Sequence, residues 1–189
     1  REVVDLRYRG YGCPGPTRIE TKDGTVVEKN YLDFWGEDES AWSLPFRCKV
    51  CPDGIGEAAD LAAADTWPGG SPTWEGQADD PGTNAVLART RAGLELMEAA
   101  ARDGALVVEG DVNARYMDEV QPHQVDKKRA VWARHLGLRT AGRLAPETHR
   151  LRIADLAKGN GVAENLRQAR GTRRRVRAGK TSEPTPRPE

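Results

Sequence analysis

The sequence predicts a mixed α/β fold, in which a small β unit and a βαβ element precede C-terminal helices. Residues 3–9 begin with β-branched side chains and then alternate apolar and polar ones, which is typical of a half-buried strand. Residues 85–110 read as strand, helix and strand at the spacing of a βαβ unit. Apolar residues at three-to-four spacing within 123–138 predict a long amphipathic helix.

The N-terminal β unit is expected to be one strand followed by a hairpin. After the strand at 3–9, the glycine- and proline-rich residues 10–16 predict a tight turn. Residues 17–29 predict a hairpin, because TRIET and TVVEK flank the turn sequence KDG. The aromatic and acidic residues 31–42 are then read as a short helix and a connection.

The middle of the chain is expected to hold a long surface loop and then the βαβ element. Residues 68–84 are rich in Pro, Gly, Ser and Asp, which is typical of a loop. Residues 85–90 predict a buried strand, residues 91–104 a helix that ends at Gly104, and residues 105–110 a second strand.

The C-terminal third is expected to be helical and then disordered. The helix at 123–138 has one apolar face, and its basic residues are expected largely elsewhere. That face is formed by Val131, Trp132, His135 and Leu138. A further helix is expected near 162–170, and residues 171–189 have almost no apolar side chains, which predicts disorder. We therefore expect a domain at 1–140, a helical extension at 141–170 and a tail at 171–189.

Charge is balanced over the whole chain but not along it. The 29 Lys and Arg equal the 29 Asp and Glu, which excludes a uniformly basic nucleic-acid coat protein. Up to Ala114 there are 11 basic and 21 acidic residues (net −10), and after it 18 and 8 (net +10). This asymmetry suggests two surfaces with different partners. An arginine cluster near the C-terminus fits a solvated tail better than a nucleic-acid site; it comprises Arg173, Arg174, Arg175 and Arg177.

No apolar run is long enough to cross a bilayer, and the first ten residues lack the apolar core of a signal peptide. The chain is therefore expected to be cytoplasmic and to have no membrane span. Because it starts at Arg1 inside a strand-like pattern, we also expect it to be an N-terminally truncated fragment.

The most specific local feature is the CxxC sequence at 48–51. Two thiolates at this spacing can converge on one zinc ion or iron–sulfur cluster. The alternatives are a thioredoxin-like redox pair, which requires the start of a helix, and two ordinary cysteines in a loop. Pro52 and Gly54 follow at once, which favours a loop.

The chain offers too few ligands for a closed site. Zinc and 4Fe–4S clusters usually take four protein ligands, and beyond Cys48 and Cys51 there is only the distant Cys13 and three scattered histidines. Cys13 is either a thiol that approaches a cluster or a small residue packed in a turn. The histidines are read as structural, and are His123, His135 and His149. The acidic residues that follow the cysteines are read as either cofactor or magnesium contacts or a solvated loop; they are Asp53, Glu57, Asp60 and Asp65.

Taken in order, several motifs resemble the C-terminal region of the beta subunits of coenzyme F420 hydrogenases and dehydrogenases. They are YRGYGCPG at 8–15, the KDG hairpin, RCKVCPDGIGEAADLAAADTW at 47–67, AVLARTRAGLELMEAA at 85–100 and HQVDKKRAVWAR at 123–134. The resemblance covers roughly residues 5–140.

This resemblance implies an iron–sulfur flavoprotein core of which the chain is a fragment. The implied cofactors are FAD and one or more 4Fe–4S clusters, with hydride transfer between the flavin and an organic acceptor such as coenzyme F420. The resemblance makes Cys48 and Cys51 cluster ligands, and places 60–67, with Asp60 and Asp65, in the wall around the cofactors. Two departures from the family are ADLAAADTW, where relatives have a serine and a glycine before the aspartate, and Cys13, where many have Trp.

We therefore expect part of an oxidoreductase that works with a redox partner protein or subunit, while this fragment alone is expected to be inactive. The remaining cluster ligands are expected upstream of Arg1. The alternative is a non-catalytic zinc-binding interaction module, whose cysteine pair is structural and whose basic tail recruits a partner.

Overall fold

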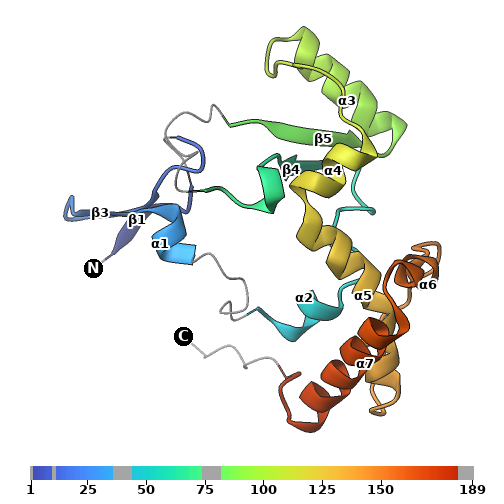
Figure 1. Cartoon of the computed structure of the whole chain (residues 1–189). Coiled ribbons are helices and arrows are strands. Elements are labelled where there is room, and N and C mark those ends of the chain that lie inside the picture. The colour runs from blue at the N-terminus through green and yellow to red at the C-terminus, as the bar shows by residue number, and fades with distance from the viewer. Residues whose placement is uncertain (1, 10–11, 36–43, 74–81, 183–189) are drawn as a thin grey trace. The chain divides into compact units, whose positions relative to one another are not determined.

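The computed structural model describes residues 2–9, 12–35, 44–73 and 82–182 (Figure 1). Its elements confirm the mixed α and β class. The strands are β1 (Val3–Arg7), β2 (Thr17–Thr21), β3 (Val26–Lys29), β4 (Leu61–Asp65) and β5 (Asn84–Ala88). The α-helices are α1 (Tyr31–Trp35), α2 (Phe46–Val50), α3 (Arg91–Arg102), α4 (Ala114–Val120), α5 (Pro122–Arg139), α6 (Ile153–Leu156) and α7 (Val162–Arg177). Two short 3-10 turns are η2 (Pro68–Gly70) and η3 (Ala157–Gly159).

The strands form two small sheets. The predicted strand and hairpin are confirmed: β1, β2 and β3 pair in that order, with antiparallel pairing such as Leu6 with Ile19 and Ile19 with Val27. The hairpin turn is closed by Asp23, whose carboxylate accepts hydrogen bonds from the Thr21 hydroxyl (2.6 Å) and the Thr25 amide (3.1 Å). The second sheet pairs β4 with β5.

The βαβ element is wrong in its last strand. The strand β5 and the helix α3 are present, but residues 105–110 form no strand. Val107 is 86% and Val108 58% exposed, so apolar residues that suggested this strand face solvent. The strand that pairs with β5 is β4, whose sequence LAAAD has weak strand propensity and was not predicted.

The chain divides into two compact units. The first unit comprises residues 1–43, 63–86 and 109–122, and the second comprises residues 44–62, 87–108 and 123–189. In the first unit, α4 packs on η2, and Leu32, Trp67 and Val120 are among its buried residues.

The second unit is built around α5. Val50 of α2, Leu138 of α5 and Val176 of α7 form its apolar cluster, on which Phe46 and Ala141 pack. α5 and α7 approach closely at one glycine, because a Cβ at Gly137 would lie 2.8 Å from the Thr172 Cβ.

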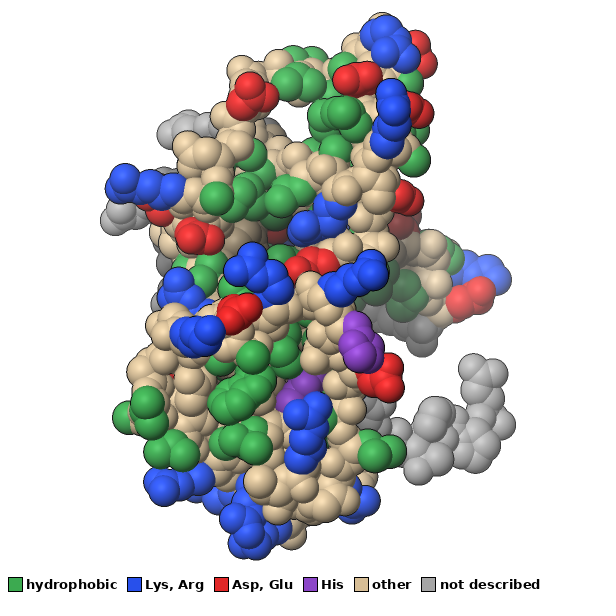
Figure 2. Space-filling model, turned by 90° about the vertical axis from the view of Figure 1, so that its right-hand side faces the viewer, with side chains coloured by type: hydrophobic (Ala, Val, Ile, Leu, Met, Phe, Trp, Pro, Cys, Tyr) green, Lys and Arg blue, Asp and Glu red, His purple; other side chains and the backbone are tan. Residues whose placement is uncertain are grey.

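The predicted disorder from residue 171 onward is wrong for residues 171–177. α7 continues to Arg177 because Thr172 and Val176 are buried against the rest of the unit. Tertiary packing therefore overrides the low apolar content of this segment. Figure 2 shows lysine and arginine side chains gathered at the lower edge of this unit. Residues 183–189 of the predicted tail lie outside the described residues, as do the connection expected within 36–43 and the loop residues 74–81.

One residue of α5 also differs from the prediction. The helix runs from Pro122 to Arg139, and Val131, His135 and Leu138 are buried as expected. Trp132, however, is exposed at the margin of that face. Among the described helices, none combines the length and the apolar character that a membrane span requires.

Candidate functional site

The two cysteines of the CxxC sequence lie at the end of a short helix, so the predicted loop is wrong for Cys48. Cys48 lies within α2, and Cys51 is the residue at which the helix stops, with an extended backbone (φ −60°, ψ 125°). Both thiols are half-buried and free of disulfides. A thioredoxin-like pair would begin a helix, whereas this pair ends one.

One of the two residues between the cysteines, Val50, fixes α2 to the core of its unit. Val50 is buried against Leu138 and Val176. Because a five-residue helix is not stable alone, this contact holds the cysteine pair in place. After α2 the chain turns back, and the Cys51 thiol donates a hydrogen bond to the Asp53 carbonyl oxygen at 3.3 Å.

The first two acidic residues after the cysteines are used to fold the loop. The Asp53 carboxylate accepts hydrogen bonds from the amides of Glu57 (2.6 Å) and Ala58 (3.0 Å). Burial raises the pKa of Asp53, but these amide bonds and the charge of Lys128 outweigh it, and the pKa lies below its usual value. The Glu57 carboxylate forms an ion pair with Lys128. Both carboxylates therefore have structural partners, which the solvated-loop interpretation did not include, and their role as cofactor or magnesium contacts stays a prediction.

Three side chains of α5 bind backbone carbonyls around Cys51. Arg134 Nη1 donates to the Lys49 carbonyl at 2.8 Å, and His135 Nε2 donates to the Val50 carbonyl at 2.8 Å. Lys128 Nζ donates to the Pro52 carbonyl at 2.6 Å. Lys128 is only 7% exposed, and a lysine this deeply buried needs a partner of opposite charge. The ion pair with Glu57 supplies it.

Lys128 and Arg134 were expected largely off the apolar face of α5, but Lys128 is buried and Arg134 is half-buried. The missed signal is the spacing: Lys128 precedes Val131 by three residues and His135 by seven, so it lies on the same helical stripe. Residue type assigned it to solvent, whereas periodicity assigns it to the interior.

The other two predicted cofactor contacts lie in different places. The Asp60 carboxylate accepts a hydrogen bond from the Thr90 hydroxyl at 2.5 Å, next to the start of α3, in the unit that contains the cysteines. Asp65 belongs to the first unit, where its carboxylate pairs with Arg9 at 2.8 Å. The cofactor-binding role of Asp60 and Asp65 stays a prediction.

Cys13 takes part in an aromatic and cationic cluster of the first unit. Its sulfur accepts a hydrogen bond from the Trp67 indole at 3.4 Å, and the Arg9 guanidinium lies 5.3 Å from the Trp67 ring centre. The ring of Tyr31 lies 6.1 Å from that of Trp67. Burial lowers the pKa of Arg9, but its hydrogen bond to Asp65 and that residue's charge outweigh this and raise it. These contacts support the interpretation of Cys13 as a packed residue.

The donor set fits one half of a thiolate site. In the described part of the chain, no three residues among His, Cys, Asp and Glu are grouped so that they could hold a metal ion. The ring of His135 is committed to the Val50 carbonyl, and His149 is exposed beside Glu147. Cys48 and Cys51 offer two half-buried sulfurs at one helix end, and soft ligands of this kind suit zinc or an iron–sulfur cluster.

Comparison with known proteins and protein families gives one match, to a family model. Residues 1–113 match the model of the family described as the C terminus of the beta subunit of coenzyme F420 hydrogenase/dehydrogenase. The matched segment includes α2 and both cysteines, and it ends before α5. No curated protein and no solved structure matches the chain.

Proposed function

We propose that this chain, which belongs to the family formed by the C-terminal region of coenzyme F420 hydrogenase/dehydrogenase beta subunits, is part of an iron–sulfur flavoprotein oxidoreductase. In this proposal Cys48 and Cys51 are two of the four ligands of a 4Fe–4S cluster, and other segments of the enzyme supply the rest. When bound, the cluster and FAD supply one-electron relay and hydride chemistry toward an organic acceptor such as coenzyme F420.

The observation that carries this proposal is the presentation of the two thiols. α2 and its last residue place two half-buried sulfurs at one helix end, with Val50 anchored between them in the apolar cluster. Half-burial protects a bound cluster from water on one side and leaves the other side open to further ligands. The protein's share of the chemistry is to hold this pair in a fixed place.

The family's description as a beta subunit also supports a partner subunit that exchanges electrons with this one. The basic end of the second unit and the balanced total charge fit a protein partner better than a nucleic acid. We place the enzyme in the cytoplasm.

Iron analysis of cysteine variants tests this proposal. In the full-length protein purified without oxygen, Cys48→Ser and Cys51→Ser should each lower the iron per protein by at least about half, because each removes a thiolate ligand. Cys13→Ser is the matched control and should keep the wild-type iron content, since its sulfur contacts Trp67. Circular dichroism of each variant verifies that the helices are intact.

Unchanged iron in both Cys48→Ser and Cys51→Ser would overturn the ligand assignment. A wild-type protein with stoichiometric zinc, no iron and no flavin would instead support the zinc-binding interaction module.

A further inference from the structure

The helix α5 caps the end of α2 from outside. The last carbonyls of any α-helix have no partner within the helix. Here the carbonyls of Lys49 and Val50 are bound by Arg134 and His135, and the carbonyl of Pro52 is bound by Lys128. Basic side chains are suited to this role because they carry donors and positive charge.

These contacts set the orientation of three peptide groups around Cys51. A trans peptide group is planar, so its N–H points opposite to its C=O. With the carbonyls of Lys49, Val50 and Pro52 turned toward α5, the amides of Val50, Cys51 and Asp53 are turned away from it. The backbone that connects the two thiols is therefore held on one side by a single helix.

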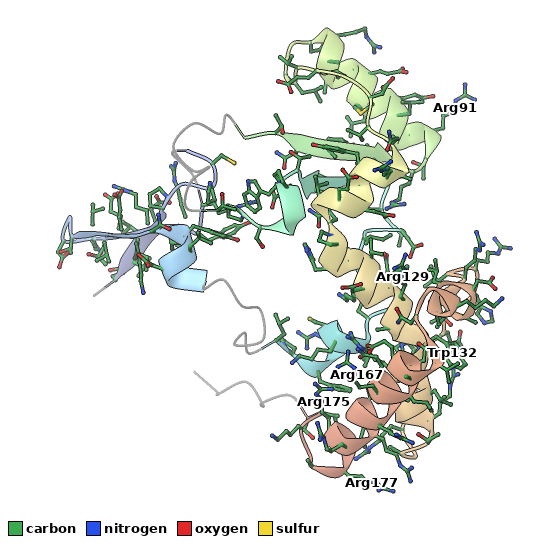
Figure 3. All side chains as sticks on the ribbon, viewed as in Figure 1. Arg91, Arg129, Trp132, Arg167, Arg175 and Arg177 are labelled. Atoms are coloured by element: carbon green, nitrogen blue, oxygen red, sulfur yellow. The ribbon has the colours of Figure 1, made fainter. Side chains whose placement is uncertain are left out.

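The interior position of these basic side chains is energetically unfavourable in itself. Burial lowers the pKa of Arg134, as do the positive charges of Arg175 and Arg167, which project from α7, and Glu164 partly compensates (Figure 3). His135 is fully buried, and its second ring nitrogen has no hydrogen-bond partner. Replacing buried ionic groups by well-packed apolar residues is often neutral or stabilising, so the presence of these polar groups points to a task at the carbonyls.

We propose that Lys128, Arg134 and His135 are positioning residues, which hold the backbone of the CxxC segment so that the two thiols are set for ligand binding before a metal arrives. This inference rests on the proposed function, and it adds that the placement of the two thiols depends on side chains of α5. α5 lies outside residues 1–113, the segment that matches the family model.

Arg134→Gln is the first test, since it shortens the side chain and removes its charge. In the full-length protein, the rate at which an iron chelator removes the cluster should rise at least about tenfold, as for other residues that orient metal ligands. The electron paramagnetic resonance spectrum of the reduced cluster should also change. Arg134→Lys should restore part of the wild-type behaviour, and Arg170→Gln, at an exposed residue of α7, should leave both readouts unchanged.

A second readout does not require a cluster. In metal-free protein, the alkylation rates of Cys48 and Cys51 by iodoacetamide should change several-fold in Arg134→Gln, while the rate of Cys13 stays at its wild-type value. If the proposed function fails because neither cysteine variant loses iron, this comparison still decides whether α5 positions the thiols.

Folding is verified by circular dichroism and urea unfolding. If Arg134→Gln does not fold, Lys128→Met replaces it, because methionine retains most of the buried side-chain stem and removes the donor to Pro52. A folded variant with wild-type chelation rate, spectrum and alkylation rates would overturn the positioning role.

Discussion

The helices α3 and α5 look alike in sequence and differ in burial. Both carry apolar residues at helical spacing, yet Gly93 is the single buried residue of α3 in the structure, and Leu94 is 42% exposed. α5 buries residues on two faces, because Val131 and Ala133 lie about 200° apart around the helix and both are fully buried. Helical periodicity thus predicts where a helix forms, but it does not tell how much of that helix other elements cover.

The largest difference between the two helices is expected for a buried charge. Val131→Asp places a carboxylate where the side chain has no contact with water, and should lower the unfolding free energy by about 4 kcal/mol or more. Leu94 is the corresponding apolar residue on α3, and Leu94→Asp should lower the unfolding free energy by about 1 kcal/mol, because of helix propensity and partial burial. Urea unfolding followed by circular dichroism measures both. Equal losses would show that α3 is packed as tightly as α5.

A second comparison concerns glycines where α5 meets α7. Gly137→Ala should destabilise by about 1–3 kcal/mol, because the new Cβ would collide with the Ala169 carbonyl and with Thr172. Gly171→Ala is the control within α7: its Cβ meets only the Arg175 guanidinium at 3.5 Å, so it should stabilise by about 0.5–1 kcal/mol. Thermal unfolding midpoints should move in opposite directions. A stabilising Gly137→Ala would mean that the two helices are farther apart.

The buried histidine of α5 should make stability depend on pH. Burial and, less strongly, the charge of Arg139 lower the pKa of His135, although its bond to Val50 acts in the opposite direction. The unfolded state then binds a proton that the folded state rejects, so stability is complete above a pH of about 6.5 and falls as the pH drops below it, by at most about 1.4 kcal/mol per pH unit.

Urea unfolding at several pH values between neutrality and mild acid measures this slope. His135→Gln should flatten it, whatever its effect on absolute stability, whereas His149→Gln, at an exposed residue, should leave it unchanged. A slope that is identical in wild type and His135→Gln would contradict the buried, neutral ring.

The smallest effect is expected on the exposed surface of α3. Arg91 pairs with Glu95 at 3.2 Å, and the Arg91 side chain is almost completely exposed (Figure 3). Arg91→Ala should therefore change the unfolding free energy by at most about 0.5 kcal/mol, and addition of salt should reduce the difference further. A loss above about 1 kcal/mol would indicate that α3 binds a partner in solution and that the Arg91–Glu95 pair contributes to this contact.

Much of the local structure could be predicted from the sequence. The KDG turn has a strong local cause, and the hairpin around it forms as expected. The long helix at 123–138 also forms, because its apolar spacing covers many turns. Errors arose where tertiary contacts decide: α7 extends to Arg177 through two buried residues, and residues 105–110 have no strand beside them among the described residues.

The spacing of Cys48 and Cys51 is a local signal, and it allowed the two thiols to be expected near each other. Their role as metal ligands stays a prediction, and the contacts that support the pair were not predicted. The support from Lys128 and Arg134 depends on a contact between segments about 80 residues apart, which no local pattern encodes. Lys128 lies seven residues before His135, on the same helical stripe, and this spacing was the available clue to its burial. Its charge had assigned it to the surface instead.

The central claim, that the cysteine pair belongs to an iron–sulfur cluster, is tested most directly by metal and sulfide analysis of the full-length protein purified without oxygen. The account predicts iron with an equal amount of acid-labile sulfide, and a cluster signal in electron paramagnetic resonance that is lost or altered in Cys51→Ser. Zinc bound to the same cysteines, without iron or sulfide, would contradict it.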